Sequence, residues 1–434
     1  MKWKFNEKSK YKKILDKEKE IGRAEIHSFH RYFGKLIPAI PSAYIKEFTK
    51  EGDTIGDLFS GSGTVAVESK INNRNFLGCE INPLSSFVSN IKTRNYDVCV
   101  LNDLNKLIEE NLYNDEITNN IKLGNVPFCV NLEHWFKPDV INDLLLIKAV
   151  IDNVVENYYK KINKIEYKEF YYGVVSAIIR NVSNADPQHV FPGISKRIRK
   201  MEEEGKIHKD AKKSFINAIK KRTKYFCVYD QTNKSNINII NGDSVNDDFS
   251  KYKNCVDLFV TNPPYISSVR YIETMKLEMY WMEYLKSQSE YGALAKLMVG
   301  NDKVAKKEID DELLTNFEEI NEKINALRNI DKKNAYIVAK YFIDMEKVIR
   351  NMNIMLKKEG RVVVKISESN VKKIKIDTGK FLTIIAEKNG FILEDVFLDK
   401  INENSRSLTT ARNTYSDIIL NDNIIIWKKV EDVE

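Results

Sequence analysis

Five consecutive residues of the chain have the side chains and backbone groups needed to act on an aromatic amino group: Thr261-Asn262-Pro263-Pro264-Tyr265. They follow an apolar run, residues 256–260, that has the length of a buried strand. Two prolines mark the end of this strand, because proline cannot donate a hydrogen bond to a sheet. Ligands of open α/β sheets bind at the carboxyl ends of the strands, so the position of the loop suits catalysis.

The residue types of this loop suit methyl transfer to an exocyclic amino nitrogen. Such a nitrogen is a poor nucleophile, because its lone pair is delocalised into the ring. Two acceptors aimed at its N–H bonds would favour the pyramidal form and free the lone pair. Asn262 could supply one acceptor through its side-chain oxygen, and Pro263 the other through its carbonyl, which the fixed φ angles of Pro263 and Pro264 hold in place. Tyr265 would then stack on the base.

On its own, the same sequence is also typical of a surface turn. The elements that must position the loop decide between the two interpretations.

A glycine-containing turn, Ser60-Gly61-Ser62-Gly63-Thr64, separates a predicted strand at residues 54–59 from a predicted helix at residues 65–70. Glycine lets the backbone approach a ligand closely, and the free N–H groups at a helix start favour a carboxylate or a phosphate. A single glycine turn is weak evidence, because many strand-to-helix turns contain glycine.

Two further predicted strands strengthen this interpretation. Residues 75–80 end in Glu80, about twenty residues after the turn, where its carboxylate could accept hydrogen bonds from ribose hydroxyls. Residues 237–241 lead to Asp243, which could accept from an adenine amino group. The three strand ends together indicate a cofactor that contains a nucleoside. The spacing differs from the G-x-G-x-x-G fingerprint, which argues against NAD.

At this point the chain resembles the S-adenosylmethionine-dependent DNA amino-methyltransferases, which modify adenine N6 or cytosine N4. Residues 57–64 are similar to the cofactor loop of that family, residues 80–84 to its ribose-binding segment, and Asn262-Pro263-Pro264-Tyr265 to its catalytic loop. Residues 33–41 are similar to the segment that covers the methionine part of the cofactor. Leu58 stands where many members have proline, but its side chain is not needed for cofactor contact.

The resemblance implies S-adenosylmethionine as cofactor, double-stranded DNA as substrate and a Rossmann-like α/β sheet with helices on both faces. It also allows a cognate restriction endonuclease as a partner. The cofactor site is expected to contain Phe33, Lys35, Asp57, Phe59, Ser60, Gly61, Ser62, Gly63, Thr64, Glu80, Ile81, Asn82, Asp243 and Ser244.

The domain organisation follows from the order of these motifs. We expect an N-terminal segment and cofactor-binding half over 1–91, a largely helical insertion over 92–235, and a catalytic half over 236–434 with a second insertion at about 286–333. Other predicted elements are a solvated helix within 1–25, helices starting near Pro41 and over 271–285 and 334–356, a strand at 361–366, and closing antiparallel strands at 390–397 and at 418–420 with 424–427.

A basic segment in the larger insertion is the predicted DNA-binding region. Residues 191–226 contain twelve Lys or Arg against four acidic residues, an excess of +8. Such a run is usually a solvated helix face. Beside a base-modifying loop, it also suits phosphate neutralisation. The predicted DNA contacts are Lys196, Arg197, Arg199 and Lys200, with Arg406 and Arg412 of a polar loop that could insert at the gap left by a flipped base.

Composition sets the broad class. The 434 residues carry a net charge of +7, a mild tilt towards a polyanionic partner. Five cysteines without C-x-x-C spacing indicate neither disulfides nor zinc, and no apolar run approaches the roughly 20 residues of a membrane span, so we expect a cytoplasmic protein. His27 and His30 lack a third metal ligand, so packing or polar contacts are expected and no metal is.

The predicted reaction is direct in-line methyl transfer to an extruded base, without a covalent enzyme intermediate. The absence of a Pro-Cys dipeptide argues against cytosine C5 chemistry, which needs a thiolate. Asn262, where serine is the alternative, favours adenine N6 over cytosine N4. An RNA or protein amide methyltransferase and a non-catalytic DNA-binding relative remain as alternatives from other classes. The sequence does not give the recognition site or the oligomeric state.

Overall fold

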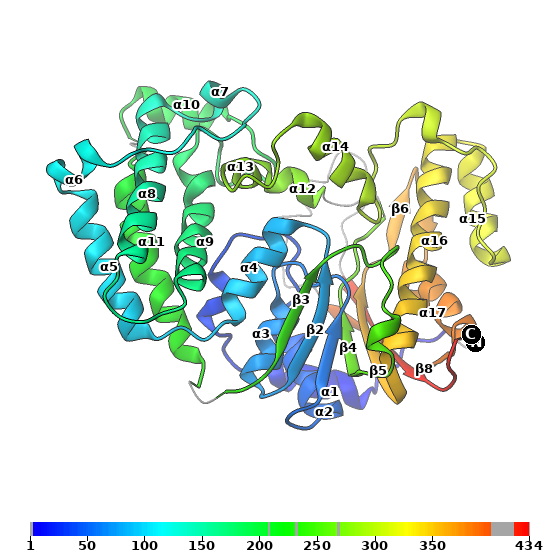
Figure 1. The fold of residues 1–434 in the computed structure, drawn as a ribbon. Coiled ribbons are helices and arrows are strands. Elements are labelled where there is room, and N and C mark those ends of the chain that lie inside the picture. The colour runs from blue at the N-terminus through cyan, green and yellow to red at the C-terminus, as the bar shows by residue number, and fades with distance from the viewer. Residues whose placement is uncertain (1–2, 207–208, 231–232, 267–269, 401–420, 434) are drawn as a thin grey trace.

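A seven-stranded sheet lies at the centre of the molecule (Figure 1). The structure is a computed structural model that describes residues 3–206, 209–230, 233–266, 270–400 and 421–433. The strand order is β3-β2-β1-β4-β5-β9-β8. The strands are β1 (Thr54–Asp57), β2 (Asn75–Glu80), β3 (Ile237–Asn241), β4 (Val256–Thr261), β5 (Leu356–Ile366), β8 (Phe391–Lys400) and β9 (Asn421–Lys429).

The first five strands are parallel, whereas β9 runs antiparallel to both β5 and β8. The strand order reverses between β1 and β4, and ligands of such sheets bind in the crevice at the carboxyl ends of the strands on either side of that point. The short strands β6 (Ser369–Val371) and β7 (Ile374–Ile376) form a separate pair. This topology confirms the predicted Rossmann-like α/β fold.

Helices cover both faces of the sheet, as the alternation of its buried side chains requires. In β4, Leu258 and Val260 contribute to one core and Phe259 to the other. One face packs on α1 (Lys10–Lys19), α2 (Ala39–Phe48) and α3 (Thr64–Ile71). The other packs on α16 (Lys332–Met355) and α17 (Thr378–Lys388), and α15 (Glu318–Arg328) packs against α16.

The segment between β2 and β3 is largely helical, as predicted, and stands beside the sheet in Figure 1. After α4 (Pro83–Thr93), the helical lobe consists of α5 (Val98–Leu112), α6 (Asp115–Asn120), α7 (Leu132–Trp135), α8 (Pro138–Glu156), α9 (Lys164–Val182), α10 (Lys196–Glu203) and α11 (Ala211–Tyr225). Its hydrophobic core is continuous with Phe29 and with Leu84 and Ile91 of α4. The helical lobe therefore packs on the N-terminal loop that contains Phe29 and on the helix that follows β2.

The prediction of one continuous helix over 271–285 is wrong. Two short helices, α12 (Tyr271–Thr274) and α13 (Lys276–Trp281), are separated at Met275, and Glu283 has a φ of 59°. The break lets the chain bend over the helical lobe, where Trp281 packs edge-on against Phe136. Tertiary packing has thus overridden the helical periodicity. The second insertion continues with α14 (Gln288–Leu297) before α15.

The closing part of the sheet agrees with the predicted strands at 361–366, 390–397 and 424–427. The helix predicted over 334–356 corresponds to α16. The strand predicted at 418–420 lies outside the described residues, as do Arg406 and Arg412. Among the described residues, no helix combines the length and apolar composition of a membrane span.

The N-terminal helix is shorter and less solvated than predicted. In α1, Tyr11 and Leu15 are buried against the core that contains Tyr44 and Phe397. Ser9 caps the helix by accepting from the backbone N–H of Lys12, and its hydroxyl also donates to Asp395 of β8. The segment is therefore a structural part of the sheet's cover.

We predict that Leu15→Ala lowers the free energy of unfolding by about 2–5 kcal/mol, because it leaves a cavity at a fully buried position. Lys13→Ala, two residues away on the exposed side of the same helix, is the matched control. Chemical denaturation measures both. Equal effects of the two variants would show that the helix does not pack on the sheet.

Candidate active site

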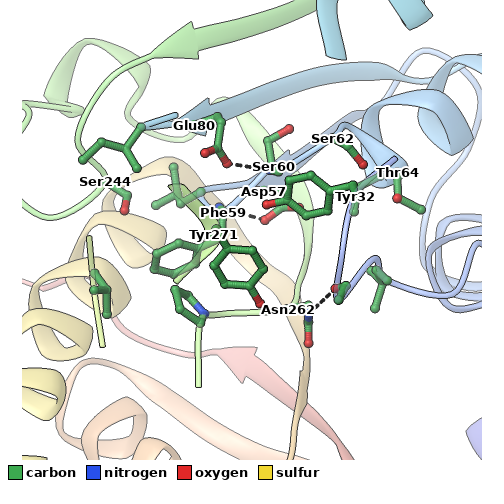
Figure 2. A pocket seen from close by; sticks show the side chains of 18 of the residues that line it. Tyr32, Asp57, Phe59, Ser60, Ser62, Thr64, Glu80, Ser244, Asn262 and Tyr271 are labelled. Atoms are coloured by element: carbon green, nitrogen blue, oxygen red, sulfur yellow. Dashed lines mark hydrogen bonds between the residues drawn. The ribbon is translucent and has the colours of Figure 1, made fainter. Parts of the chain in front are cut away.

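A cavity of about 780 Å³ opens at the carboxyl ends of β1, β2 and β4 (Figure 2). It brings together most of the residues predicted to bind a cofactor: Lys35, Asp57, Phe59, Ser60, Gly61, Ser62, Thr64, Glu80, Ile81, Asp243 and Ser244, with Asn262 and Pro264 of the catalytic loop. We call this the first cavity.

Asp57 links the glycine turn to the catalytic loop. Its Oδ1 accepts from the backbone N–H of Phe59 at 3.0 Å and from Oγ1 of Thr261 at 2.7 Å. Burial raises the pKa of Asp57 to about 7, although both hydrogen bonds act against this shift. The carboxylate thus holds the ends of two adjacent strands at a fixed separation.

Glu80, at the end of β2, links the glycine turn to the segment that precedes α4. One carboxylate oxygen accepts from the backbone N–H of Gly61 at 2.7 Å, and the other accepts from the N–H of Asn82 at 2.8 Å. Burial raises the pKa of Glu80 to about 7, with these two hydrogen bonds opposing the shift. Each carboxylate oxygen keeps a free lone pair, so ribose hydroxyls can still donate to this group.

The glycines of the turn are required by backbone geometry. Gly61 and Gly63 have φ values of 51° and 75°, in the region that favours glycine. A Cβ on Gly63 would lie 1.9 Å from Oγ of Ser89, and one on Gly61 would lie 3.1 Å from the hydroxyl of Tyr32. Gly63 itself does not line the first cavity.

The polar groups of the first cavity fit S-adenosylmethionine. Ser60 and Ser62 line the cavity, yet both hydroxyls are buried without a hydrogen-bond partner among the described residues. A buried hydroxyl without a partner is costly, which indicates that a polar ligand completes these bonds. The Glu80 carboxylate lines the same cavity and could accept from the two hydroxyls of a ribose. Asp243 lines it from the end of β3.

Two tyrosines that the sequence analysis did not select also line the first cavity. The rings of Tyr32 and Tyr271 stack, with centroids 5.8 Å apart and an interplanar angle of 15° (Figure 2). Each hydroxyl lies close to a glycine: a Cβ on Gly34 would be 3.1 Å from the Tyr271 hydroxyl, and Gly61 lies beside Tyr32. The stacked pair forms an aromatic wall that joins the N-terminal loop to α12.

Some predicted cofactor residues lie outside the first cavity. The Phe33 ring is covered by the Arg31 guanidinium, 4.4 Å from its centroid, and does not line the cavity. Asn82 is the N-cap of α4, and its side-chain oxygen accepts from the backbone N–H of Leu84. Lys35 does line the cavity, but its ammonium donates to the carbonyls of His27 and His30, both at 2.7 Å.

The two histidines make polar contacts within the protein. His27 contacts Glu68 at 2.6 Å, and His30 contacts Oγ of Ser176 at 3.0 Å. In the described part of the chain, no group of three or more His, Cys, Asp or Glu is arranged to hold a metal ion.

The catalytic loop stands at the junction of two cavities. The Asn262 amide nitrogen donates to the carbonyl of Gly34 at 3.4 Å, and its side-chain oxygen accepts from the Tyr265 hydroxyl, also at 3.4 Å. Asn262 also lines a larger second cavity together with Tyr265, Lys365, Ser367 and Asp422. Pro263 lines neither cavity with its side chain.

The Tyr265 hydroxyl is fixed by a polar cluster at the floor of the second cavity. It lies 3.2 Å from Nζ of Lys365 and 3.4 Å from the Asp422 carboxylate. Lys365 and Asp422 form a buried ion pair at 2.7 Å, and Ser367 donates to the same carboxylate. These three partners come from β5, the segment after it and β9, so sequence spacing could not indicate them.

The predicted DNA-binding residues of α10 are exposed but not equivalent. Arg197 forms an ion pair with buried Asp186 at 2.7 Å. Burial alone would raise the pKa of Asp186, but hydrogen bonds from Ser195, Gln188 and Arg197 lower it to about 2. Lys196, Arg199 and Lys200 are exposed on the same helix, and Lys200 lies 3.8 Å from the Glu204 carboxylate.

The fold and the first cavity define a class: an α/β enzyme with a site for a nucleoside-containing cofactor beside an Asn-Pro-Pro-Tyr loop. A family model for N6/N4 methyltransferases, described as DNA methylase, matches residues 2–86. The chain is 26% identical over 401 residues to the Type II methyltransferase M.MvaI of Kocuria varians, a match that covers 87% of this chain and 86% of that protein.

More distant or shorter similarities were also found. The chain is 35% identical over 98 residues to the Type II methyltransferase M.MjaII of Methanocaldococcus jannaschii, which is 21% of this chain and 18% of that protein. The match to a TehB-like SAM-dependent methyltransferase structure from Corynebacterium glutamicum covers 96% of this chain and 97% of that one, at 9% identity and a TM-score of 0.30.

Both matches support the S-adenosylmethionine-dependent DNA amino-methyltransferase of the N6/N4 family that the sequence motifs indicate.

We predict that Glu80→Ala weakens S-adenosylmethionine binding by about 1.5–3 kcal/mol, because it removes charged hydrogen bonds to the ribose and releases the N–H of Gly61. Isothermal titration calorimetry measures the affinity. Glu51→Ala, an exposed acidic residue near the opposite end of β1, is the control. Unchanged affinity of the Glu80 variant would remove Glu80 from the site.

Proposed function

We propose that this enzyme methylates the exocyclic amino group of a base flipped out of double-stranded DNA, with adenine N6 as the favoured target. The observation that carries the proposal is the position of Asn262, which lines both the first and the second cavity. A methyl donor in the first cavity and a base in the second would meet at this side chain. Bases must leave the stack for such chemistry.

The catalytic loop would activate the amino group through two acceptors. The Asn262 nitrogen is directed to the Gly34 carbonyl, and its oxygen accepts from the Tyr265 hydroxyl at 3.4 Å. Because an amide oxygen has two lone pairs, it can also accept from one N–H of the substrate. The Pro263 carbonyl would accept from the other, and neither proline has an N–H that competes. These acceptors interact most strongly with the pyramidal nitrogen, so they favour the transition state over the ground state.

The remaining residues would position the two reactants. S-adenosylmethionine, when bound, supplies an electrophilic methyl group on its sulfonium. Glu80, Ser60 and Ser62 would hold the nucleoside end of this cofactor. Tyr265 lies half-buried in the second cavity with its hydroxyl held by Lys365, so its ring has a fixed orientation for stacking on the base.

Cytosine N4 is the second candidate target, and a specific contact favours it. The Lys365 ammonium lies 3.2 Å from the Tyr265 hydroxyl in the second cavity. On its Watson–Crick edge, cytosine presents two acceptors beside its amino group, whereas adenine presents one, so an ammonium donor there suits cytosine. Mass spectrometry of nucleosides from methylated duplex DNA separates N6-methyladenine from N4-methylcytosine and decides between the two targets.

An RNA or protein amide substrate is the more distant alternative. Transfer of a labelled methyl group to DNA, RNA and protein in parallel tests it. Labelling of DNA alone supports the proposal, and labelling of RNA or protein without DNA contradicts it. A cognate endonuclease would be indicated by a nuclease that cleaves the same site and is blocked by the modification.

We predict that Asn262→Ala lowers turnover by about 10² or more with little change in cofactor affinity, because it deletes an acceptor used most strongly in the transition state. Asn120→Ala on the exposed surface of α6 is the matched control. Single-turnover methylation and calorimetry measure the two quantities. Wild-type turnover in the Asn262 variant would refute the proposed role.

We also predict that replacing Lys196, Arg199 and Lys200 together with methionine weakens binding to all duplex sequences alike. If these exposed cations bind phosphates, the slope of log K against log salt should fall by about 0.9 for each phosphate that the variant no longer neutralises. Arg197 is left intact because its ion pair with Asp186 supports the local fold.

The control replaces Lys347, Lys358 and Lys388, which are exposed on α16, β5 and α17. An unaltered slope in the α10 variant would show that the exposed cations of this helix only face solvent and do not bind DNA. Sequence preference should survive in both variants, because phosphate contacts position the duplex and base-edge contacts specify it.

A further inference from the structure

A third cavity, of about 770 Å³, lies between the helical lobe and the loop that precedes α2. Its lining combines four cationic side chains, Arg31, Lys35, Arg180 and Arg222, with one carboxylate, Glu278. The cations come from the N-terminal loop, α9 and α11, so three separate segments place positive charge around one space. Such convergence is typical of a site for an anion.

Arg180 is the strongest single observation. It is 2% exposed, and one of its guanidinium nitrogens, Nη2, donates to the His189 carbonyl at 3.1 Å. Nε and Nη1 are buried without a hydrogen bond among the described residues. A guanidinium offers five N–H donors in a fixed fork, and leaving them unpaired in a buried position is costly. An anion in the cavity would complete these bonds.

The neighbouring groups support the same ligand. Arg31, which is half-buried, donates to the same His189 carbonyl at 2.6 Å, so the two guanidinium groups converge on one point. Arg222 donates to the carbonyl of Phe29. His30 lines the cavity as a neutral imidazole, because burial lowers its pKa to about 3.

The position of the cavity indicates the source of the anion. Lys35 lines all three cavities, and Tyr32 lines the first and third. An anion in the third cavity would therefore lie next to both the cofactor and the target base. A phosphodiester of the substrate is the anion that must pass close to a flipped base, and Arg is well suited to phosphate through its planar fork.

We propose that the third cavity binds one backbone phosphate of the DNA substrate through Arg31 and Arg180. This inference rests on the proposed function. It adds a phosphate anchor beside the active site that is separate from the exposed cations of α10. The anchor would fix the backbone while the target base enters the second cavity.

Glu278 provides an internal alternative to a phosphate. Its side chain is buried, and one carboxylate oxygen has no hydrogen-bond partner among the described residues. Burial raises the pKa of Glu278, and the positive charges of Arg180 and Arg31 oppose this rise without cancelling it. If the cations serve only to neutralise Glu278, removal of its charge should harm the protein. If they bind a phosphate, it should not weaken DNA binding, because a like charge leaves the site.

The experiment measures duplex binding as a function of salt for Arg31→Met, Arg180→Met and the double variant. We expect each single variant to lower the slope of log K against log salt by about 0.9, and the double variant to lower it by no more than that, because the same single phosphate is involved in every case. Lys388→Met, an exposed cation on α17, is the control with no expected change. Slopes equal to that of the wild type would overturn the inference.

Glu278→Gln supplies the second test. DNA binding at least as tight as that of the wild type supports a phosphate site, and weaker binding overturns it. If thermal unfolding shows that Arg180→Met does not fold, Arg31→Met and Glu278→Gln carry the test. Wild-type methylation of the same duplex is measured in parallel. No methylation would refute the proposed function, whereas methylation with unaltered slopes would refute the phosphate anchor alone.

Discussion

The active site depends on the buried carboxylate of Asp57, which accepts from the turn after β1 and from Thr261 at the end of β4. Glu80 repeats this arrangement between β2 and the same turn. Burial raises the pKa of both acids to about 7, so each contributes stability that is complete below its unfolded pKa and is lost as the pH rises through about 7. At neutral pH the folded protein thus holds costly negative charge, which a cationic cofactor would offset.

The sequence was sufficient to predict the elements that carry this arrangement. The strands β1, β2 and β4 are short, β1 and β2 end in the acids Asp57 and Glu80, and Pro263 lies just after β4. These local signals identified the Rossmann-like fold and most of the residues that line the first cavity. The parts that were missed depend on contacts between distant segments. Tyr32 and Tyr271, which stack in the first cavity, are 239 positions apart.

The incorrect predictions have the same physical origin. The helix over 271–285 breaks because its apolar residues are buried in the core of the helical lobe, and the N-terminal helix is docked because Leu15 completes a core made by distant strands. Arg197 resembles a DNA contact when only its neighbours in sequence are considered, but Asp186, eleven positions away, binds it. Charge and periodicity describe a residue's chemistry, and the tertiary partner decides how that chemistry is used.

Lys35 connects the cavities into one system. Its ammonium donates to two carbonyls, and burial lowers its pKa to about 8. A nearby charge can therefore change the protonated fraction of Lys35 near neutral pH. A phosphate in the third cavity would favour the charged form, whereas a cationic cofactor in the first would disfavour it. The two ligands therefore act in opposite directions on one group that lines both sites. Once methyl transfer has converted the sulfonium to a neutral thioether, only the phosphate would still act on the charge of Lys35.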